Sequence, residues 1–360
     1  MGAMKALIAM SGGVDSSVAA YLAKKAGYEC IGCTMRLFRN EDVGISHVKT
    51  CCSLDDVEDA QSVAHKIGIP YYVFNFSDGF REKVIEKFVR SYESGATPNP
   101  CIDCNRYMKF DKLYERAKIL GCEYIVTGHY ARIEKQDGKY VLKKALDETK
   151  DQSYVLYSLT QEQLEHALFP LGNMSKSDAR RIAEENGFIN ADKPDSQDIC
   201  FVPNGKYAEF LEYYTGKSYS AGRFIYSDGT VLGEHKGIVR YTVGQHKGLG
   251  ISSEEPLYVK AINAEDNTVT LCKERELYSK DVFVNDFNWI SGEAPQSEIR
   301  CVAKIRYRQK EQWATVMPIN ETAVKIVFDE PLRAVTPGQA AVLYSDDTVL
   351  GGGTISKFDT

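Results

Sequence analysis

The chain has 360 residues, of which 43% are hydrophobic and 26% charged, and its formal net charge is −6. These values are ordinary for a soluble globular protein, and the length favours two or three domains over a single compact core. No stretch approaches the ~18 apolar residues that a membrane span needs, and the acidic balance excludes a general affinity for nucleic acid, so any RNA binding must come from local basic faces.

The ten cysteines bear on the compartment in which the protein works. The apolar run at residues 6–10 is short and leads straight into a glycine loop, so we do not expect a secretory signal peptide. Without such a signal, this many thiols indicates a reducing cytoplasm, where cysteines serve metals or catalysis rather than disulfides. We therefore expect a cytoplasmic protein with no membrane contact.

The first ~130 residues alternate short apolar runs with helical patterns, which predicts an α/β fold with a parallel sheet and crossover helices. Strands are expected at residues 6–10, 30–35, 71–74 and 124–126. A helix that ends at Gly27 should follow the first strand, and further helices are expected at residues 55–66 and 100–120.

Glycine turns and short alternating strands dominate from about residue 219 onwards. Strands at residues 222–226, 258–262 and 268–272 predict a small β-rich domain. Those at residues 301–307, 323–328 and 340–344 predict a C-terminal antiparallel barrel. We divide the chain into an α/β enzyme domain (1–215), a central β-rich domain (216–278) and the barrel (279–360).

A glycine loop between the first strand and the first helix is the strongest candidate for a nucleotide site. Its two adjacent glycines let successive N–H groups point inward, and the helix N-terminus adds positive charge towards a phosphate. The loop lacks the Gly-Lys-Ser/Thr ending of a Walker P-loop, so transfer of a γ-phosphate is not expected. The residues that we expect to bind the nucleotide here are Ala9, Met10, Ser11, Gly12, Gly13, Val14, Asp15 and Ser16.

Two further residues should meet this loop at the carboxyl ends of the parallel strands, where open sheets of this class bind ligands. Met35 ends the second predicted strand and could pack on adenine. Gly128 follows a later strand and could admit the nucleotide close to the backbone.

The loop at residues 11–16 resembles the SGGxDS signature of the ATP pyrophosphatases, which hold pyrophosphate while AMP passes to an acceptor. More short motifs follow in order over essentially the full length, and together they resemble the tRNA-specific 2-thiouridylases. These motifs are Cys51-Cys52-Ser53, Asn99-Pro100 with Cys104-Asn105, Thr127-Gly128-His129-Tyr130-Ala131, Lys150-Asp151-Gln152-Ser153-Tyr154, Ser196-Gln197-Asp198-Ile199-Cys200-Phe201, Gly244-Gln245-His246-Lys247-Gly248-Leu249-Gly250 and Pro337-Gly338-Gln339.

This resemblance implies a Rossmann-like ATP pyrophosphatase domain and a tRNA-binding barrel. It implies an enzyme that uses ATP and Mg²⁺ to adenylate the 2-oxygen of the wobble uridine, in the anticodon region of tRNA. Sulfur then replaces that oxygen, giving 2-thiouridine, AMP and pyrophosphate. The sulfur would come from a cysteine desulfurase, a sulfur relay protein or free sulfide.

The resemblance also implies roles for individual residues. Cys104 would carry a persulfide that attacks C2 of the uridine, and Cys200 would assist, in one view by forming a disulfide that releases the sulfur. Contacts with tRNA, including the target base, are implied for Asn99, Pro100, Cys101, His129, Lys150, Asp151, Gln152, Arg306, Tyr307 and Gln339.

Cys101 departs from the family pattern, which has Asp at this position, so the acid–base role of that Asp is in doubt here. Asn99 should cap a helix with Pro100 in its first turn. Cys101 and Cys104 would then share a face at the positive end of the helix dipole, which lowers a thiol pKa, whereas Asp103 would point away.

Three uses of the thiols are open. Cys101, Cys104 and Cys200 could hold a [4Fe–4S] cluster at three irons and leave the fourth iron for sulfide. Alternatively, Cys104 and Cys200 act as a persulfide–disulfide pair, or the thiols bind zinc, which would want a fourth ligand. No chemistry is evident for Cys51 and Cys52, and the remaining cysteines are expected to be small core residues: Cys30, Cys33, Cys122, Cys272 and Cys301.

Two rows of basic residues could bind RNA phosphates. One row follows helical spacing after Cys104 and comprises Arg106, Lys109, Lys112 and Arg116. The other lies on the even-numbered face of a predicted strand and comprises Arg300, Lys304, Arg306, Arg308 and Lys310.

Two rival functions also remain. One is an amide-forming ATP pyrophosphatase that acts on a small molecule, which the basic barrel strand and the cysteine motifs oppose. The other is a non-catalytic RNA-binding or redox-sensing relative, which the intact nucleotide loop opposes.

Overall fold

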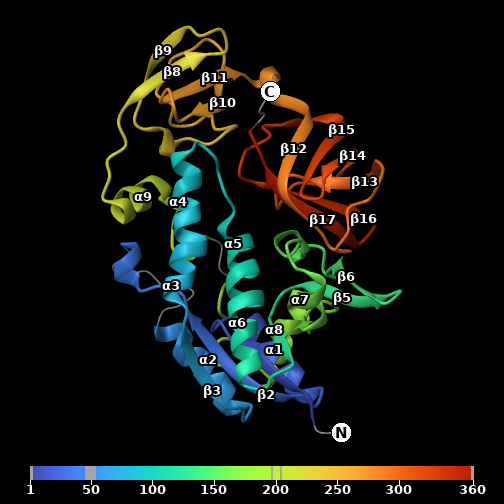
Figure 1. Ribbon diagram of the computed structural model, residues 1–360. Helices are drawn as coiled ribbons and strands as arrows, with labels where there is room; N and C mark the ends of the chain where they lie inside the picture. The colour runs from blue at the N-terminus through green and yellow to red at the C-terminus, as the bar shows by residue number, and fades with distance from the viewer. Residues whose placement is uncertain (1–2, 45–53, 196–197, 203–204, 358–360) are drawn as a thin grey trace.

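The structure is a computed structural model that describes residues 3–44, 54–195, 198–202 and 205–357 (Figure 1). Its N-terminal region is built on a parallel sheet with the strand order β3-β2-β1-β4-β7, which confirms the predicted α/β fold. The strands are β1 (Lys5–Ala9), β2 (Glu29–Arg36), β3 (Tyr71–Asn75), β4 (Tyr124–Val126) and β7 (Ala167–Leu168).

Helices pack on this sheet through small and branched side chains. Val18 and Ala19 on the first helix are fully buried against Ile8 of the central strand. That helix ends as predicted, because Gly27 adopts φ +91°, a conformation that glycine tolerates at no steric cost. The helices of this layer are α1 (Val14–Lys25), α2 (Leu54–Lys66) and α8 (Lys176–Glu185).

Two long helical segments rise side by side from the sheet (Figure 1). The first comprises α3 (Ser77–Phe80), a π-helical stretch (Arg81–Ile85) and α4 (Glu86–Glu93), and our sequence analysis did not identify it. The second comprises α5 (Pro100–Asp103), a π-helical stretch (Cys104–Lys112) and α6 (Leu113–Ile119), where a single helix was predicted. Lys87 donates to the Asp103 carboxylate at 2.7 Å and ties the two segments together.

A central β domain covers the upper end of these helices (Figure 1). Its sheet has the order β10-β11-β8-β9, and its core is continuous with that of α4, since Phe88, Phe201 and Phe224 belong to one buried cluster. The elements are α9 (Tyr207–Thr215), β8 (Gly222–Tyr226), β9 (Val231–His235), β10 (Leu257–Asn263) and β11 (Thr268–Lys273).

The last domain is the predicted antiparallel barrel, which closes through pairing of β12 with both β15 and β17. Its strands are β12 (Tyr278–Trp289), β13 (Ile299–Lys304), β14 (Gln312–Asn320), β15 (Ala323–Arg333), β16 (Ala340–Ser345) and β17 (Thr348–Ile355). A hairpin from the N-terminal region, β5 (Ala131–Gln136) and β6 (Lys139–Lys144), extends the barrel sheet beside β17. The α/β region and the barrel therefore share one hydrogen-bonded sheet.

The remaining helical elements are short. They are η1 (Asn40–Val43), η4 (Ser153–Val155), α7 (Gln161–Glu165), η6 (Ile238–Arg240) and η7 (Glu274–Leu277). None of the helices in the described ranges is long and apolar enough to cross a membrane.

The predicted basic strand face is wrong. β13 ends at Lys304 and a turn follows, so Arg306, Arg308 and Lys310 do not continue a strand. Lys304 is buried, with its ammonium over the rings of Tyr154 and Tyr344, and burial lowers its pKa. Period-two alternation assumes that the strand continues past Lys304, so it could not foresee the turn. It also does not show which face of a strand other elements cover, so it could not foresee that Lys304 is buried.

Thr97, in the loop between the two long helical segments, links the three domains. Its N–H donates to the Pro337 carbonyl at 2.8 Å, and its carbonyl accepts from Gln339 Nε2 at 2.6 Å. Its hydroxyl lies 3.3 Å from that of Thr242 in the central domain. The barrel and the central domain thus both hold the loop that leads into α5.

Gly338 is the residue that permits this close approach. Its φ is +88°, and an added Cβ would lie 2.9 Å from the Thr97 nitrogen. Gly292, in the same domain, has φ +83°, and no described atom lies within 4 Å of its Cβ position.

We expect Gly338→Ala to lower the thermal midpoint more than Gly292→Ala, because only the first adds a clash to the shared left-handed strain of about 1–2 kcal/mol. Equal shifts in differential scanning calorimetry would show that the Thr97 contact does not need a glycine.

Candidate active site

The glycine loop lies between β1 and α1, as the sequence predicted. Gly12 adopts φ +74°, and an added Cβ would lie only 2.3 Å from the carbonyl oxygen of Asp56, so α2 packs directly against the loop. The Ser16 hydroxyl accepts from the Ser11 N–H at 3.1 Å and donates to the Gly13 carbonyl at 2.9 Å. The loop is therefore held in a tight turn around the Ser16 side chain.

The other predicted nucleotide residues surround this turn. Ala9 ends β1, Val14 begins α1, and the buried Met10 donates its N–H to the Cys33 carbonyl at 2.8 Å. Gly128 follows β4, and an added Cβ would lie 2.7 Å from the Asp15 carbonyl carbon. Met35, near the end of β2, packs against two of the buried clusters. The structure thus brings the ends of β1, β2 and β4 together.

A network of charged side chains adjoins the loop. Lys176 Nζ donates to both oxygens of the Asp15 carboxylate at 2.7 Å and lies 2.7 Å from Asp195 Oδ1. The other Asp195 oxygen accepts from Lys150 at 2.9 Å, and the Tyr130 hydroxyl donates to Asp15 at 2.8 Å. Burial alone would raise the pKa of Asp195, but the hydrogen bonds from Lys176 and Lys150 lower it.

Sequence analysis missed Lys176 and gave Tyr130 no role. Tyr130 stood inside a recognised motif, and burial together with the Asp15 carboxylate raises its pKa, so it remains a neutral donor. Lys176 is the first residue of α8, after the N-cap Ser175. The cap pattern marks where that helix starts, but no local signal shows that the helix packs beside α1.

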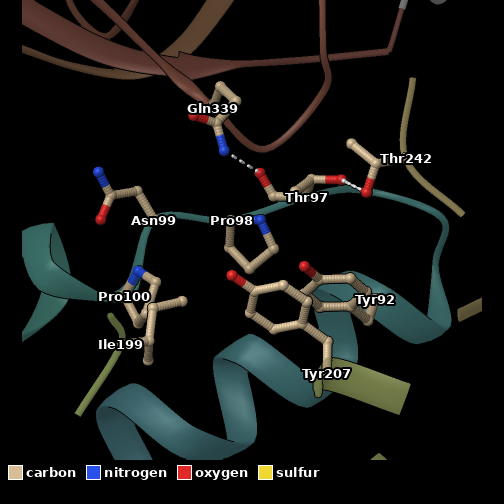
Figure 2. Close-up of a pocket in the computed structure, with 9 residues that line it drawn as sticks. All are labelled: Tyr92, Thr97, Pro98, Asn99, Pro100, Ile199, Tyr207, Thr242 and Gln339. Atoms are coloured by element: carbon tan, nitrogen blue, oxygen red, sulfur yellow. Dashed lines mark hydrogen bonds between the residues drawn. The ribbon is translucent and has the colours of Figure 1, made fainter. Parts of the chain in front are cut away.

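A pocket of about 360 Å³ lies where the three domains meet (Figure 2). Tyr92 and Tyr207 stack at one side, with centroids 5.8 Å apart and an interplanar angle of 18°. Asn99 and Pro100 belong to the segment that begins α5, whereas Ile199 directly precedes Cys200. The remaining lining residues are Thr97, Pro98, Thr242 and Gln339. Both cysteine-bearing segments therefore reach this pocket.

The thiols of interest belong to these two segments and follow the lining residues Pro100 and Ile199 in the chain. The Asn99 side chain caps α5 by accepting from the Cys101 N–H at 3.2 Å, as predicted. Cys101 is exposed, whereas Cys104 and Cys200 are half-buried and pack against one hydrophobic cluster. Across the part of the chain that the structure describes, no three His, Cys, Asp or Glu residues are grouped as metal ligands. Cys51, Cys52, Ser196 and Gln197 lie outside the described residues.

Several residues predicted to contact tRNA make contacts within the protein. Arg306 donates to the Ala334 carbonyl at 2.8 Å, and the Tyr307 hydroxyl donates to the Asp151 carbonyl at 2.9 Å. The Asp151 carboxylate accepts from the Ala145 and Ser153 N–H groups. Gln152 accepts from the Tyr130 N–H at 3.0 Å. Their contacts with tRNA stay predictions.

His129 is buried, with only 6% of its surface exposed. Its ring lies between Phe110 and Phe169, and its nitrogens lie 2.7 Å from Thr127 Oγ1 and 3.4 Å from Lys109 Nζ. Burial first, and then the Lys109 ammonium, lower the pKa of His129 well below its ordinary value. The neutral ring links the second helical segment to the end of β4.

The predicted basic row on that helical segment makes separate contacts within the protein. Arg106 pairs with Asp286 of β12 at 2.6 Å, and Arg116 lies over the Phe74 ring. Lys112 pairs with Glu115 at 3.0 Å. The π-helical turns at residues 104–112 are wider than α-helical turns, so helical spacing of three and four does not give one continuous row there.

The thiols should differ sharply in reactivity. Burial raises the pKa of Cys30 and of Cys272 to about 11 and that of Cys301 to about 12. Because the thiolate is the nucleophile, these three should resist iodoacetamide at pH 8, whereas the exposed Cys101 should be alkylated first. Peptide mass spectrometry during native labelling would measure the order. Labelling of Cys301 as fast as that of Cys101 would contradict the assignment of the buried thiols to the core.

Comparison with known proteins agrees with this architecture. Family models match the tRNA methyl transferase HUP domain at residues 4–204, the tRNA methyl transferase PRC-barrel domain at 208–273 and the aminomethyltransferase β-barrel domain at 279–355. The tRNA-specific 2-thiouridylase MnmA of Clostridioides difficile is 50% identical over 98% of both chains. That of Acetivibrio thermocellus is 50% identical over 99% of this chain and 100% of its own.

Among solved structures, NMN synthetase from Francisella tularensis aligns with 61% of this chain and 79% of its own, at 19% identity and a TM-score of 0.34, which is too low to support an argument. The full-length identity to the curated relatives is decisive. This chain belongs to the tRNA-specific 2-thiouridylase family.

Proposed function

We propose that this chain is an ATP-dependent tRNA 2-thiouridylase that adenylates the 2-oxygen of the wobble uridine and replaces it with sulfur. One observation carries the proposal: the three-domain pocket receives the segments that lead into Cys101–Cys104 and into Cys200 (Figure 2). Family membership and the glycine loop support the use of ATP and tRNA. Such work suits a reducing cytoplasm, where thiols persist.

The phosphates of ATP would bind at the turn around Ser16, where the N-terminus of α1 favours negative charge. Mg²⁺ fits this site, because the Asp15 carboxylate offers the hard oxygen ligand that the ion prefers. When bound, Mg²⁺ would neutralise phosphate charge. Asp15 would then hold the ion, and Ser16 would keep the loop N–H groups directed inward.

The uridine would enter the three-domain pocket, where aromatic rings and Asn99 offer stacking and hydrogen bonding to a base (Figure 2). The second helical segment connects this pocket with the nucleotide loop, since Lys109 reaches His129 directly after Gly128. The uridine 2-oxygen attacks the α-phosphorus, and pyrophosphate leaves. The new bond between the 2-oxygen and the α-phosphorus makes AMP the leaving group for the next step.

We assign the sulfur to a persulfide on Cys104, because Cys104 and Cys200 are both half-buried and pack against the same hydrophobic cluster. The terminal sulfur attacks C2 of the uridine, and AMP leaves. The Cys200 thiolate then attacks Cys104 Sγ, which breaks the sulfur–sulfur bond and leaves 2-thiouridine with a Cys104–Cys200 disulfide. A dithiol reductant restores both thiols, and a cysteine desulfurase or a relay protein then transfers the outer sulfur of its own persulfide to Cys104 and leaves as a thiol. Free sulfide would instead attack Cys104 Sγ in the disulfide, which forms the Cys104 persulfide and releases Cys200 as a thiolate without the reductant.

The nucleotide loop gives the first test. Ser16→Ala removes both hydrogen bonds that shape the turn, and Asp15→Asn removes a carboxylate that lies in it. Each should lower tRNA thiolation by roughly 100-fold or more, the size of effect seen when one oriented donor is lost. Glu29→Gln, at the opposite end of the same sheet, is the control and should be fully active.

Nucleoside mass spectrometry measures the 2-thiouridine, and tRNA-dependent ATP/pyrophosphate exchange measures adenylation. Undiminished thiolation by Ser16→Ala would remove the loop from the mechanism. Exchange that proceeds without tRNA would instead favour an amide-forming ligase.

The cysteines give the second test. Cys104→Ser and Cys200→Ser should be inactive, because each removes one sulfur of the relay. Cys101→Asp should keep activity, since it restores the family pattern, and Cys272→Ala in the central domain is the buried control. The anaerobically purified protein should be colourless and free of iron.

A brown protein with about four irons per chain, whose colour and activity both disappear in Cys101→Ser, would replace the persulfide pair by a [4Fe–4S] cluster. That result would leave the thiouridylase activity itself standing.

A further inference from the structure

The carbonyl oxygen of Gly12, in the glycine loop, is held by two side chains of the segment that follows α8. Asn190 Nδ2 donates to this oxygen at 2.9 Å, and Lys193 Nζ donates to it at 3.2 Å. The same Asn190 amide donates to the Ser17 hydroxyl at 2.9 Å, so it also joins the loop to α1. The function proposed above gives neither Asn190 nor Lys193 a role.

Both donors are fixed by their surroundings. Asn190 is only 2% exposed, and its Nδ2 must face Gly12 because a carbonyl oxygen can only accept a hydrogen bond. Lys193 Nζ also donates to the carboxylates of Asp56 and Asp59 in α2, at 2.6 Å each. The three protons of the ammonium thus meet three acceptors, one of which is the Gly12 carbonyl.

The other atom of the Asn190 amide shows what this residue contributes. Oδ1 is buried and meets no hydrogen-bond donor among the described residues. An unpaired buried carbonyl lowers the stability of a folded protein. The amide is therefore distinguished from an apolar side chain of similar size by the two bonds from Nδ2, and one of these goes to the loop.

The direction of the Gly12 carbonyl also sets the direction of the next N–H group. In a planar trans peptide the two groups point to opposite sides, so the bonds to the Gly12 oxygen aim the Gly13 N–H away from Asn190. With glycine on both sides, this peptide could otherwise turn over at little steric cost. Within the described ranges the Gly13 N–H donates to no protein acceptor, as a group that binds phosphate should.

We propose that Asn190 and Lys193 are positioning residues, which hold the Gly12 carbonyl away from the nucleotide and aim the Gly13 N–H at one of its phosphates. The proposal rests on the use of ATP proposed above. Asn190 provides the sharper test, because its replacement by leucine changes no charge and little volume.

The affinity for nucleotide and the state of the Gly13 N–H can be measured separately on the full-length protein. Calorimetry gives the affinity for α,β-methylene-ATP with Mg²⁺. Heteronuclear NMR follows the Gly13 N–H after labelling with ¹⁵N-glycine, and the spectrum of Gly13→Ala assigns its peak. In the natural protein, saturation with the analogue should move this peak downfield, because a hydrogen bond to phosphate deshields the amide proton.

Asn190→Leu should weaken binding of the analogue by roughly tenfold or more, since a hydrogen bond to a charged group is misdirected. At saturation its Gly13 peak should lose most of the downfield shift. Asn186→Leu is the matched control, because the Asn186 amide donates to the Ile182 carbonyl at 2.8 Å and not to the loop. This control should bind the analogue and shift the Gly13 peak as the natural protein does.

Lys193→Met is the second variant, and it decides the matter if Asn190→Leu does not fold. It removes a charge, which lowers the affinity by itself, so the Gly13 shift at saturation is the relevant measurement. That shift should be smaller than in the natural protein. Lys66→Met removes an ammonium that donates to the Gly187 carbonyl, and this control should keep the full shift.

The outcomes are distinct. If the natural protein binds the analogue and its Gly13 peak does not move downfield, the proposal is overturned and the proposed function stands. Natural affinity or a full Gly13 shift in Asn190→Leu, with its fold verified by circular dichroism, also overturns it. If that variant does not fold, a full shift in Lys193→Met does so. Failure of the natural protein to bind the analogue would overturn the proposed function, and this inference with it.

Discussion

The backbone of Thr97 is the point on which the arrangement of the active site depends. Both its N–H and its carbonyl are bonded to the barrel segment around Gly338, and its hydroxyl meets the central domain. Two residues later, Asn99 caps the helix that carries Cys101 and Cys104. Because a cap fixes where a helix begins, the two β domains determine where these thiols stand relative to the phosphate loop.

The parallel sheet and the phosphate loop could be predicted because their signals are local. A buried parallel strand reads as a short apolar run, and two adjacent glycines such as Gly12-Gly13 indicate a tight loop. The segment of α3 and α4 escaped notice although Phe80, Val84 and Phe88 recur at helical spacing and are buried. The π-helical turns change the side-chain period, which no propensity argument includes.

The site was predictable only in part, and for a different reason. Cys104 and Cys200 stood in motifs that the family shares, so the resemblance supplied roles that spacing alone could not. Lys176 has no such motif, and its importance arises from a partner 161 positions away in the chain. Likewise, Lys304 looked like an exposed strand cation but lies between two tyrosine rings. The roles of Lys176 and Lys304 are set by which distant parts of the chain pack against them, and a local sequence pattern does not contain that information.

The hairpin of β5 and β6 has a consequence for the synthesis of the protein. Its partner in the barrel sheet is β17, the last strand of the chain, where Thr348 pairs with Lys143 of β6. At the usual pace of translation, β17 leaves the ribosome roughly 10–40 s after the hairpin, and the hairpin edge waits unpaired meanwhile. An open strand edge is a template for misassembly. The α/β domain therefore does not mature on its own during translation, but completes its outer edge only when the last strand arrives.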